Sequence, residues 1–140
     1  MHAWIFQALR DRFDLSEPSL SGDGPTVTWY ATRYRDRMAP GDVVYFWQAG
    51  PEDVRGIYAW GRLASAPYMK PGWRTFGVDV RIAGRIEPHI SVEAIRRQGA
   101  LADLLILRAP QATNFLISMK EAHAIASLAP ASVHLPPEVR

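Results

Sequence analysis

Residues 43–48, Val-Val-Tyr-Phe-Trp-Gln, carry apolar side chains on both alternating faces of the strand that they predict. A strand with one face in water alternates apolar and polar residues, whereas a strand of this kind must be covered on both sides. The sequence therefore predicts the wall of a small barrel, with a helix packed against the outside of that wall.

Other segments rich in β-branched and aromatic residues are also predicted to be strands. They are residues 3–8, 26–34, 55–64 and 76–82. Within 55–64, one face should carry Ile57, Ala59, Gly61 and Leu63, and the other Tyr58, Trp60 and Arg62. Pro40-Gly41 predicts a type II turn. Residues 9–25 predict a loop with room for one helical turn, because they are rich in Asp, Ser, Gly and Pro.

Capping signals predict two helices. Ser91 is a candidate N-cap for a short helix that ends near Gln98, before Gly99. Ser118 and Glu121 have capping-box spacing and predict a last helix over residues 119–128. The apolar run at 101–108 fits either a strand or a helix followed by a strand.

This order of elements predicts an α+β fold: a small mixed or antiparallel β-barrel of about five to six strands, flanked by helices. The strands follow one another with little helix between them, which argues against a doubly wound parallel sheet. The folded domain is expected at residues 1–129. The tail at 130–140 holds three prolines and is expected to hang loose.

Several classes of chemistry lack their usual residues. The chain has no cysteine, which excludes disulfides, thiolate nucleophiles and iron–sulfur clusters. The histidines are scattered, and no phosphate-binding loop, Gly-x-Ser-x-Gly motif or catalytic pair of carboxylates occurs. We therefore expect no catalytic residues, no metal and no cofactor. With no apolar run that could span a membrane and no signal peptide, we expect a cytoplasmic protein without a membrane partner.

The stretch from Trp29 to Trp60 interleaves aromatic residues with arginines. Aromatic faces on neighbouring strands can stack on a flipped nucleobase, and arginines at the rim can hold the flanking phosphates. The same pattern also occurs in ordinary strands, where the aromatic residues fill the core. The net charge is only +2, so we expect weak non-specific DNA binding with a shallow dependence on salt.

A set of motifs in fixed order resembles the EVE domain family. The motifs are Trp4-Ile5-Phe6-Gln7, Trp29, Arg33-Tyr34-Arg35-Asp36, residues 40–47, Gly56-Ile57-Tyr58, residues 101–105 and residues 110–115. The resemblance covers residues 3–128. It implies a PUA-like fold related to YTH domains, with a pocket for a modified nucleobase. It also implies an association with modification-dependent restriction, and hence a nuclease partner encoded nearby.

The resemblance implies an aromatic cage whose stacking walls are Trp29 and Trp47. Phe6 and Gln7 lie where the first strand contributes to the pocket. Trp47 shares a strand face with Tyr45, however, and is also suited to the core. Many relatives carry Lys-Ser where this chain has Gln7-Ala8, and Ser in place of Ala49, so polar contacts to the base are expected to differ here.

Further residues extend the predicted site. Asn114 is a candidate for hydrogen bonds to a base edge, with a simple turn residue as the alternative. Tyr34 completes the pocket, and Arg33, Arg35 and Arg37 are the predicted phosphate contacts.

The sequence thus predicts a non-catalytic reader that binds a flipped modified base in an aromatic pocket. Methylated or hydroxymethylated cytosine in DNA is the preferred ligand, and DNA is favoured over RNA. An RNA-binding PUA-like module that reads a modified or looped-out base is one alternative. A small-molecule sensor or partner-docking domain that uses the same pocket is another.

Overall fold

The computed structural model describes residues 1–8 and 26–140, so the predicted loop at 9–25 lies outside the described residues. The strands are β1 (Ala3–Ala8), β2 (Thr26–Tyr30), β3 (Val43–Gln48), β4 (Gly56–Leu63), β5 (Tyr68–Met69), β6 (Phe76–Ser91) and β7 (Asn114–Ile117). The α-helices are α1 (Val92–Arg97), α2 (Leu105–Arg108) and α3 (Met119–Leu128). Short 3₁₀ turns are η2 (Arg35–Arg37), η3 (Gly99–Leu101) and η4 (Pro137–Val139). None of the helices in the described part of the chain is long and apolar enough to cross a membrane.

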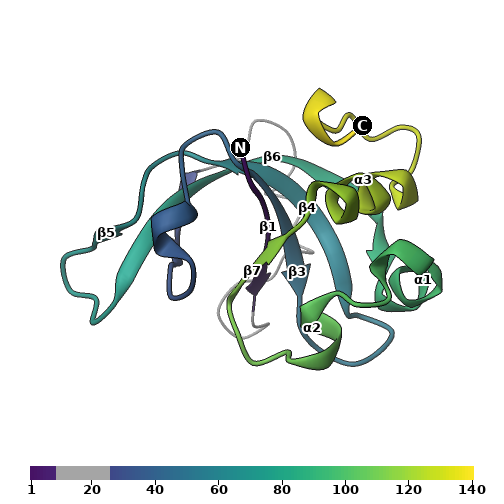
Figure 1. Cartoon of the computed structure of the whole chain (residues 1–140), viewed down its shortest axis with the longest axis horizontal. Coiled ribbons are helices and arrows are strands. Elements are labelled where there is room, and N and C mark those ends of the chain that lie inside the picture. The colour runs from purple at the N-terminus through teal and green to yellow at the C-terminus, as the bar shows by residue number, and fades with distance from the viewer. Residues whose placement is uncertain (9–25) are drawn as a thin grey trace.

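The strands form one curled mixed sheet in the order β2-β6-β4-β3-β1-β7, with β5 paired to β6. The long strand β6 arches over the molecule, and α1, α2 and α3 lie together on one side of it (Figure 1). This half-barrel flanked by helices confirms the predicted α+β class. Its seven strands in the described residues include the two-residue β5.

Two parallel strands form the centre of the sheet. β1 pairs with β3 from Ala3 opposite Val43 to Ala8 opposite Gln48, and both strands are wholly buried. Because successive side chains point to opposite faces, the two strands feed two separate cores. The strand predicted with two apolar faces, residues 43–48, is therefore confirmed in both its bounds and its burial.

The two cores have different partners. The helix-side core holds Ile5, Tyr45 and Trp47 from the central strands, packed with residues of α1 and α3. The barrel-side core holds Trp4, Phe6 and Phe46, packed with residues of β2, β4 and β6. The sheet thus separates a face covered by helices from a face enclosed by its own curl.

A bulge in β4 corrects the predicted faces of that strand. Trp47 pairs with Ile57 and Phe46 pairs with Ala59, so Tyr58 is the extra residue. The alternation is reset at this point, because Ile57 belongs to the helix-side core while Ala59 and Leu63 belong to the barrel-side core. The prediction that Ile57 shares a face with Ala59, Gly61 and Leu63 is wrong. The prediction that Tyr58 shares a face with Trp60 is also wrong, because Tyr58 packs against the barrel-side core and Trp60 against the helix-side core.

The capping signals are confirmed. The Ser91 side chain accepts a hydrogen bond from Ala94 N at 3.1 Å, and α1 begins at the next residue. Ser118 Oγ accepts from Glu121 N at 3.0 Å, and Glu121 Oε1 accepts from Ser118 N at 2.8 Å. This reciprocal capping box starts α3 at the predicted residue.

The segment between these helices differs from the prediction. Residues 101–108 contain the end of η3 and all of α2, with no strand. The strand comes later, at β7, and it pairs antiparallel with β1. A four-residue strand has too few residues for a recognisable alternation, and its existence depends on pairing with the other end of the chain.

The expectation of a loose tail is wrong. Leu135 is 5% exposed and Val139 is fully buried, and both belong to the helix-side core. Glu138 accepts two hydrogen bonds of 2.9 Å from Arg62, and the His123 ring Nδ1 lies 2.8 Å from Val139 O. The prolines lie in a turn after α3 and at η4, and they do not prevent the apolar side chains from packing.

Tyr45 places a hydroxyl inside the helix-side core. Its hydroxyl donates to Ala122 O of α3 at 2.9 Å, and burial raises the pKa of Tyr45 well above its usual value. We expect Tyr45→Phe to cost about 1 kcal/mol of unfolding free energy at neutral pH, because the Ala122 carbonyl loses a buried partner.

At alkaline pH the difference in unfolding free energy between the wild type and Tyr45→Phe should become smaller. The unfolded chain ionises Tyr45 near pH 10 while the folded chain keeps its proton, so the wild type loses stability as pH rises above about 10 and the variant lacks this loss. Urea denaturation at pH 7 and pH 10.5 checks both effects. A constant difference across this range would contradict the assignment.

Candidate nucleic-acid interface

Residues 29–37 run back alongside β1, and we call them the 29–37 segment. Four contacts place this segment. Trp29 Nε1 donates to Gln7 O (3.3 Å) near the end of β1, and Thr32 N donates to Asn114 Oδ1 (2.8 Å) of β7. The rings of Tyr34 and Trp4 lie 6.4 Å apart, and Arg37 O lies 3.0 Å from the His2 ring near the beginning of β1. The segment therefore passes from the end of β1 to its beginning. It carries Trp29 at one end and the arginines at the other.

Trp29 is a rigid aromatic plane on the barrel-side face. It is 7% exposed, and its ring centroid lies 5.3 Å from that of Phe46 and 6.2 Å from that of Phe6. Its indole NH is held by the Gln7 carbonyl. The structure thus brings together Phe6 and Trp29, two of the predicted pocket residues.

Trp47 lies on the other face of the sheet. It is 1% exposed in the helix-side core, and its indole NH has no hydrogen-bond partner in the described part of the chain. Trp29 belongs to the barrel-side core, so the two tryptophans are not opposite walls of one pocket. The reason is alternation along β3, which places Trp47 with Tyr45, on the face that the helices cover.

Gln7 has a fixed amide. Its Nε2 donates to Pro110 O and to Ala112 O, both at 2.8 Å, and the side chain is 9% exposed. With both amide hydrogens used by the loop before β7, the Oε1 oxygen is the end of the side chain that can accept a hydrogen bond from a ligand.

Asn114 ties β7 to the 29–37 segment. Its Nδ2 donates to Tyr30 O at 2.9 Å, and its Oδ1 accepts from Thr32 N at 2.8 Å and Thr32 Oγ1 at 3.3 Å. It is 1% exposed, in a strand and not in the turn that was the alternative. β2 ends at Tyr30 and not at residue 34 as predicted, and the Asn114 amide holds the residues that follow it.

The sequence reasoning missed Gln48. This residue is 1% exposed at the end of β3, and its Nε2 lies 3.4 Å from both Ala8 O and Ala49 O. The buried polar side chains of the described residues are Gln7, Asp42, Gln48 and Asn114. Gln7 and Gln48 lie at the carboxyl ends of the parallel strands β1 and β3. A polar residue that closes an otherwise apolar run was the signal that could have identified it.

The predicted phosphate contacts form an exposed cationic group. Arg33, Arg35 and Arg37 are all exposed, and within the described chain none makes an ion pair with a carboxylate. The Arg35 guanidinium lies 4.2 Å from the ring centroid of Phe76, and that of Arg37 lies 5.7 Å from Tyr34. Tyr34 has φ 55° and is 41% exposed.

Five arginines elsewhere have glutamate partners, whereas Arg74, Arg81, Arg108 and Arg140 have none within the described residues. The pairs are Arg55–Glu52, Arg62–Glu138, Arg85–Glu87, Arg96–Glu52 and Arg97–Glu93. The 29–37 segment contains one acidic residue, Asp36. Its positive charge is thus available to an external anion, and aromatic rings hold two of the guanidinium groups in place.

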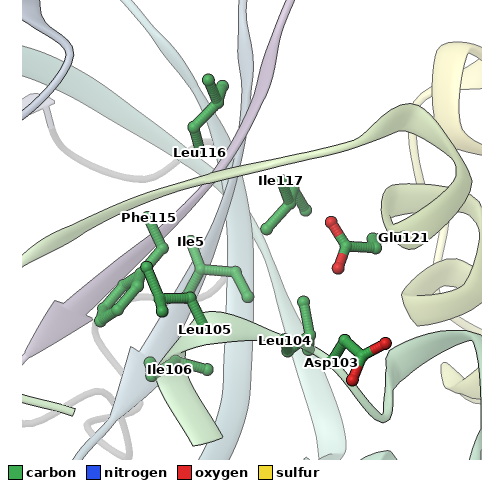
Figure 2. Close-up of a pocket in the computed structure, with 9 residues that line it drawn as sticks. All are labelled: Ile5, Asp103, Leu104, Leu105, Ile106, Phe115, Leu116, Ile117 and Glu121. Carbon is green, nitrogen blue, oxygen red and sulfur yellow. The ribbon is translucent and has the colours of Figure 1, made fainter. Parts of the chain in front are cut away.

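A cavity of about 150 Å³ lies on the opposite, helix-covered side. Figure 2 shows its apolar lining from β1, β7 and α2, with the carboxylates of Asp103 and Glu121 at one end. These carboxylates would repel a phosphate backbone, so the cavity is a poor site for nucleic acid. Within residues 1–8 and 26–140, no group of three or more His, Asp or Glu could hold a metal ion.

The family model of the EVE domain matches residues 2–128. The chain belongs to the EVE domain family. No curated protein sequence matches this EVE domain at a significant level. Solved structures with the same fold confirm the architecture, at identities too low to show more than the fold.

Three of these structures span nearly the whole EVE domain. Rpa0253 from Rhodopseudomonas palustris has 12% identity and a TM-score of 0.77, and the match covers 96% of this chain and 97% of that one. A hypothetical protein from Leishmania major has 16% identity and a TM-score of 0.72, with 91% and 94% covered. Human THYN1, solved in complex with 5-methylcytosine-containing DNA, has 13% identity and a TM-score of 0.66, with 91% and 97% covered.

Proposed function

We propose that this EVE domain is a non-catalytic reader of a modified base in nucleic acid, with methylated or hydroxymethylated cytosine in DNA as its first candidate ligand. The observation that carries the proposal is the 29–37 segment, which joins the held indole of Trp29 to arginines that have no carboxylate partner among residues 1–8 and 26–140. The complex of human THYN1 with 5-methylcytosine-containing DNA supports it, because that chain has the same fold.

Trp29 is the proposed stacking partner of the base. Stacking on an aromatic ring contributes about 1–3 kcal/mol per base, which offsets much of the few kcal/mol that it takes to unpair a base. Gln7 pairs with Trp47 in the register of β1 and β3, on the face opposite Phe6, so its proposed role is to hold the loop before β7 in place. Asn114 and Trp47 then act by support: Asn114 holds the 29–37 segment, and Trp47 fixes the strand that carries Gln48.

In this proposal the shape of the site that receives the base has to provide the discrimination. Burial of one methyl carbon contributes about 0.8 kcal/mol, which is about fourfold in affinity. A shaped pocket raises a one-carbon preference to about 10–200-fold. The reader should therefore prefer its modified base by a factor within this range.

The test is a calorimetric titration of oligonucleotides that differ in one base. The panel holds matched DNA and RNA with unmodified, 5-methyl, 5-hydroxymethyl and N6-methyl bases. We expect one modified oligonucleotide to bind at least about tenfold tighter than its unmodified counterpart. Trp29→Ala should remove about tenfold or more of that affinity, because a stacking face is lost.

Trp60→Phe is the matched control. It changes a tryptophan of β4 that packs against the helix-side core and has no role in the proposed site, so the variant should keep the preference for the modified base. Equal affinity for modified and unmodified oligonucleotides would contradict the proposal. A preference confined to RNA would replace DNA with RNA as the ligand. Cytoplasmic location and a nuclease partner stay predictions.

The arginines of the 29–37 segment should contribute to binding independently of the base sequence of the DNA. We expect Arg35→Gln and Arg37→Gln each to weaken binding to modified and unmodified DNA alike, because each removes one phosphate contact. Each should also reduce the slope of log affinity against log salt by about 0.9. Anisotropy titrations at several salt concentrations measure this slope.

Arg97→Gln serves as the control for this prediction. Arg97 is an exposed arginine on α1 that pairs with Glu93. The Arg97→Gln variant loses the same charge on the helix-covered side and should leave the slope of log affinity against log salt unchanged. If all the variants lowered the slope equally, the effect would be one of net charge and not of the 29–37 segment.

A further inference from the structure

The hairpin formed by β5 and the start of β6 carries aromatic and cationic side chains outside the proposed base site. The ring centroids of Tyr30 and Trp73 lie 4.8 Å apart, and Lys70 Nζ lies 4.9 Å from the centroid of Trp73. Tyr30 is 37% exposed, and Arg74 is exposed. We call Tyr30, Lys70, Trp73 and Arg74 the hairpin platform.

The platform and the base site share β2 but use its opposite faces. Trp29 points into the barrel-side core, so its neighbour Tyr30 points to the outer face of the same strand. In Figure 1 the hairpin projects beside η2, away from the helices. Arg35 of the 29–37 segment lies over Phe76 of the hairpin, so the segment and the platform are neighbours.

The platform is held in place before any partner binds. A Cβ on Gly77 would lie 2.7 Å from the Thr28 methyl and 3.1 Å from the Trp73 ring, so the absence of a side chain at Gly77 lets the indole rest on the sheet. Trp73 N donates to Lys70 O at 3.0 Å, and Lys70 Nζ donates to Thr28 Oγ1 at 3.0 Å. Little side-chain entropy remains to be lost on binding.

The charges of the platform favour an anion. Lys70 and Arg74 make no ion pair within the described residues, and Arg35 lies over Phe76 at the base of the hairpin. The neighbouring carboxylate is Asp79, which accepts hydrogen bonds from Thr28 Oγ1 at 3.0 Å and from the Tyr68 hydroxyl at 2.7 Å. The Asp79 carboxylate is thus engaged by hydroxyl groups of the sheet and the hairpin.

We infer that the hairpin platform is a second nucleic-acid contact, which stacks an unpaired nucleotide near the bound base and holds its phosphate. The inference rests on the proposed function for its choice of partner. Rigid aromatic rings beside cations match the two parts of a nucleotide, since a base stacks on an aromatic face and a phosphate pairs with a cation. The domain then contacts an unpaired strand at two places, the base site and the hairpin platform.

The probe that isolates this contact is an unmodified oligothymidylate of about ten nucleotides, which is within the usual site size for single strands. Fluorescence anisotropy is measured for the wild type, Trp60→Phe, Trp73→Ala and the double variant Lys70→Gln/Arg74→Gln. We expect the wild type and Trp60→Phe to bind with similar affinity, because Trp60 packs against the helix-side core and belongs to neither proposed contact. Trp73→Ala should bind about tenfold more weakly.

The double variant changes charge without removing a ring. It should lower the slope of log affinity against log salt by about 1.4, which is 0.7 for each of two phosphate contacts on a single strand. The double variant Lys120→Gln/Arg108→Gln carries the same charge change on α2 and α3 and should leave the slope unchanged. This arm keeps the test decisive even if Trp73→Ala fails to fold.

The outcomes separate the two proposals. If modified oligonucleotides bind but the hairpin variants bind oligothymidylate like the wild type, the inference is overturned alone. If hairpin-dependent binding of oligothymidylate persists without any preference for a modified base, the second contact is supported and the reader proposal fails. Binding to neither probe overturns both. Equal hairpin dependence for a duplex without unpaired bases would also overturn base stacking at Trp73.

Discussion

Replacement of Asp42 with alanine should lower the unfolding free energy by about 3–4 kcal/mol, a loss typical of a buried charged acceptor with several donors. Asp42 is 2% exposed. Its carboxylate accepts from Trp4 Nε1 at 3.0 Å, from His2 N at 3.1 Å and from Ala39 N at 3.2 Å. One side chain therefore fastens the start of β1 to the turn before β3. In the variant the buried Trp4 indole NH would be left without an acceptor.

Urea denaturation followed by circular dichroism measures this loss. Asp42→Asn keeps the shape of the side chain and one oxygen, but its NH₂ group cannot accept the remaining hydrogen bonds. We therefore expect the unfolding free energy of Asp42→Asn to lie between that of Asp42→Ala and that of the wild type. Asp53→Ala is the control, because Asp53 is exposed in the next turn. A loss below about 1 kcal/mol in Asp42→Ala would be no larger than an ordinary hydrogen bond and would contradict this role.

Deletion of residues 130–140 should lower the unfolding free energy by a similar amount. It removes Leu135 and Val139 from the helix-side core. Burial of each such side chain contributes about 1.5–3 kcal/mol, so the shortened chain should lose about 4 kcal/mol. That is a large part of the 5–15 kcal/mol that stabilises a typical domain. A tail without a role in the core would leave the denaturation midpoint unchanged.

The double variant Leu135→Ala/Val139→Ala tests whether the apolar contacts account for this effect. It keeps the full length and the ion pair to Arg62, and it should reproduce most of the loss. Glu138→Gln tests the ion pair itself. Arg62 holds the pKa of Glu138 below its usual value, so any stabilisation from this exposed pair is present at neutral pH and is lost as the pH falls.

Elements with strong local signals were predictable from the sequence. The doubly apolar strand at 43–48 and the capping box at Ser118 needed no knowledge of the rest of the chain, and both match the structure. β7 and the bulge at Tyr58 could not be predicted, because each is defined by a partner strand. The prediction of a loose tail was wrong because it relied on the prolines and not on the two apolar residues, Leu135 and Val139, that are buried.

The candidate site shows the same limit. Alternation correctly placed Trp47 with Tyr45, but the sequence could not tell which face of the strand meets β2. That choice follows from the order of strands in the sheet, which also sets Trp29 beside Phe6. The amide bonds of Asn114 depend on the return of residues 30–32 to β7, a contact between parts of the chain more than 80 residues apart.

Asn114 also joins two edges of the half-barrel. Elsewhere neighbouring strands are joined by runs of backbone pairs, but between β7 and the 29–37 segment its carboxamide presents a donor and an acceptor as a peptide group would. Rotation of one side chain can release these hydrogen bonds, whereas separation of β1 from β3 would require global unfolding. The link between β7 and the 29–37 segment therefore depends on one side chain, while Trp29 keeps its own contacts with Gln7 and Phe46.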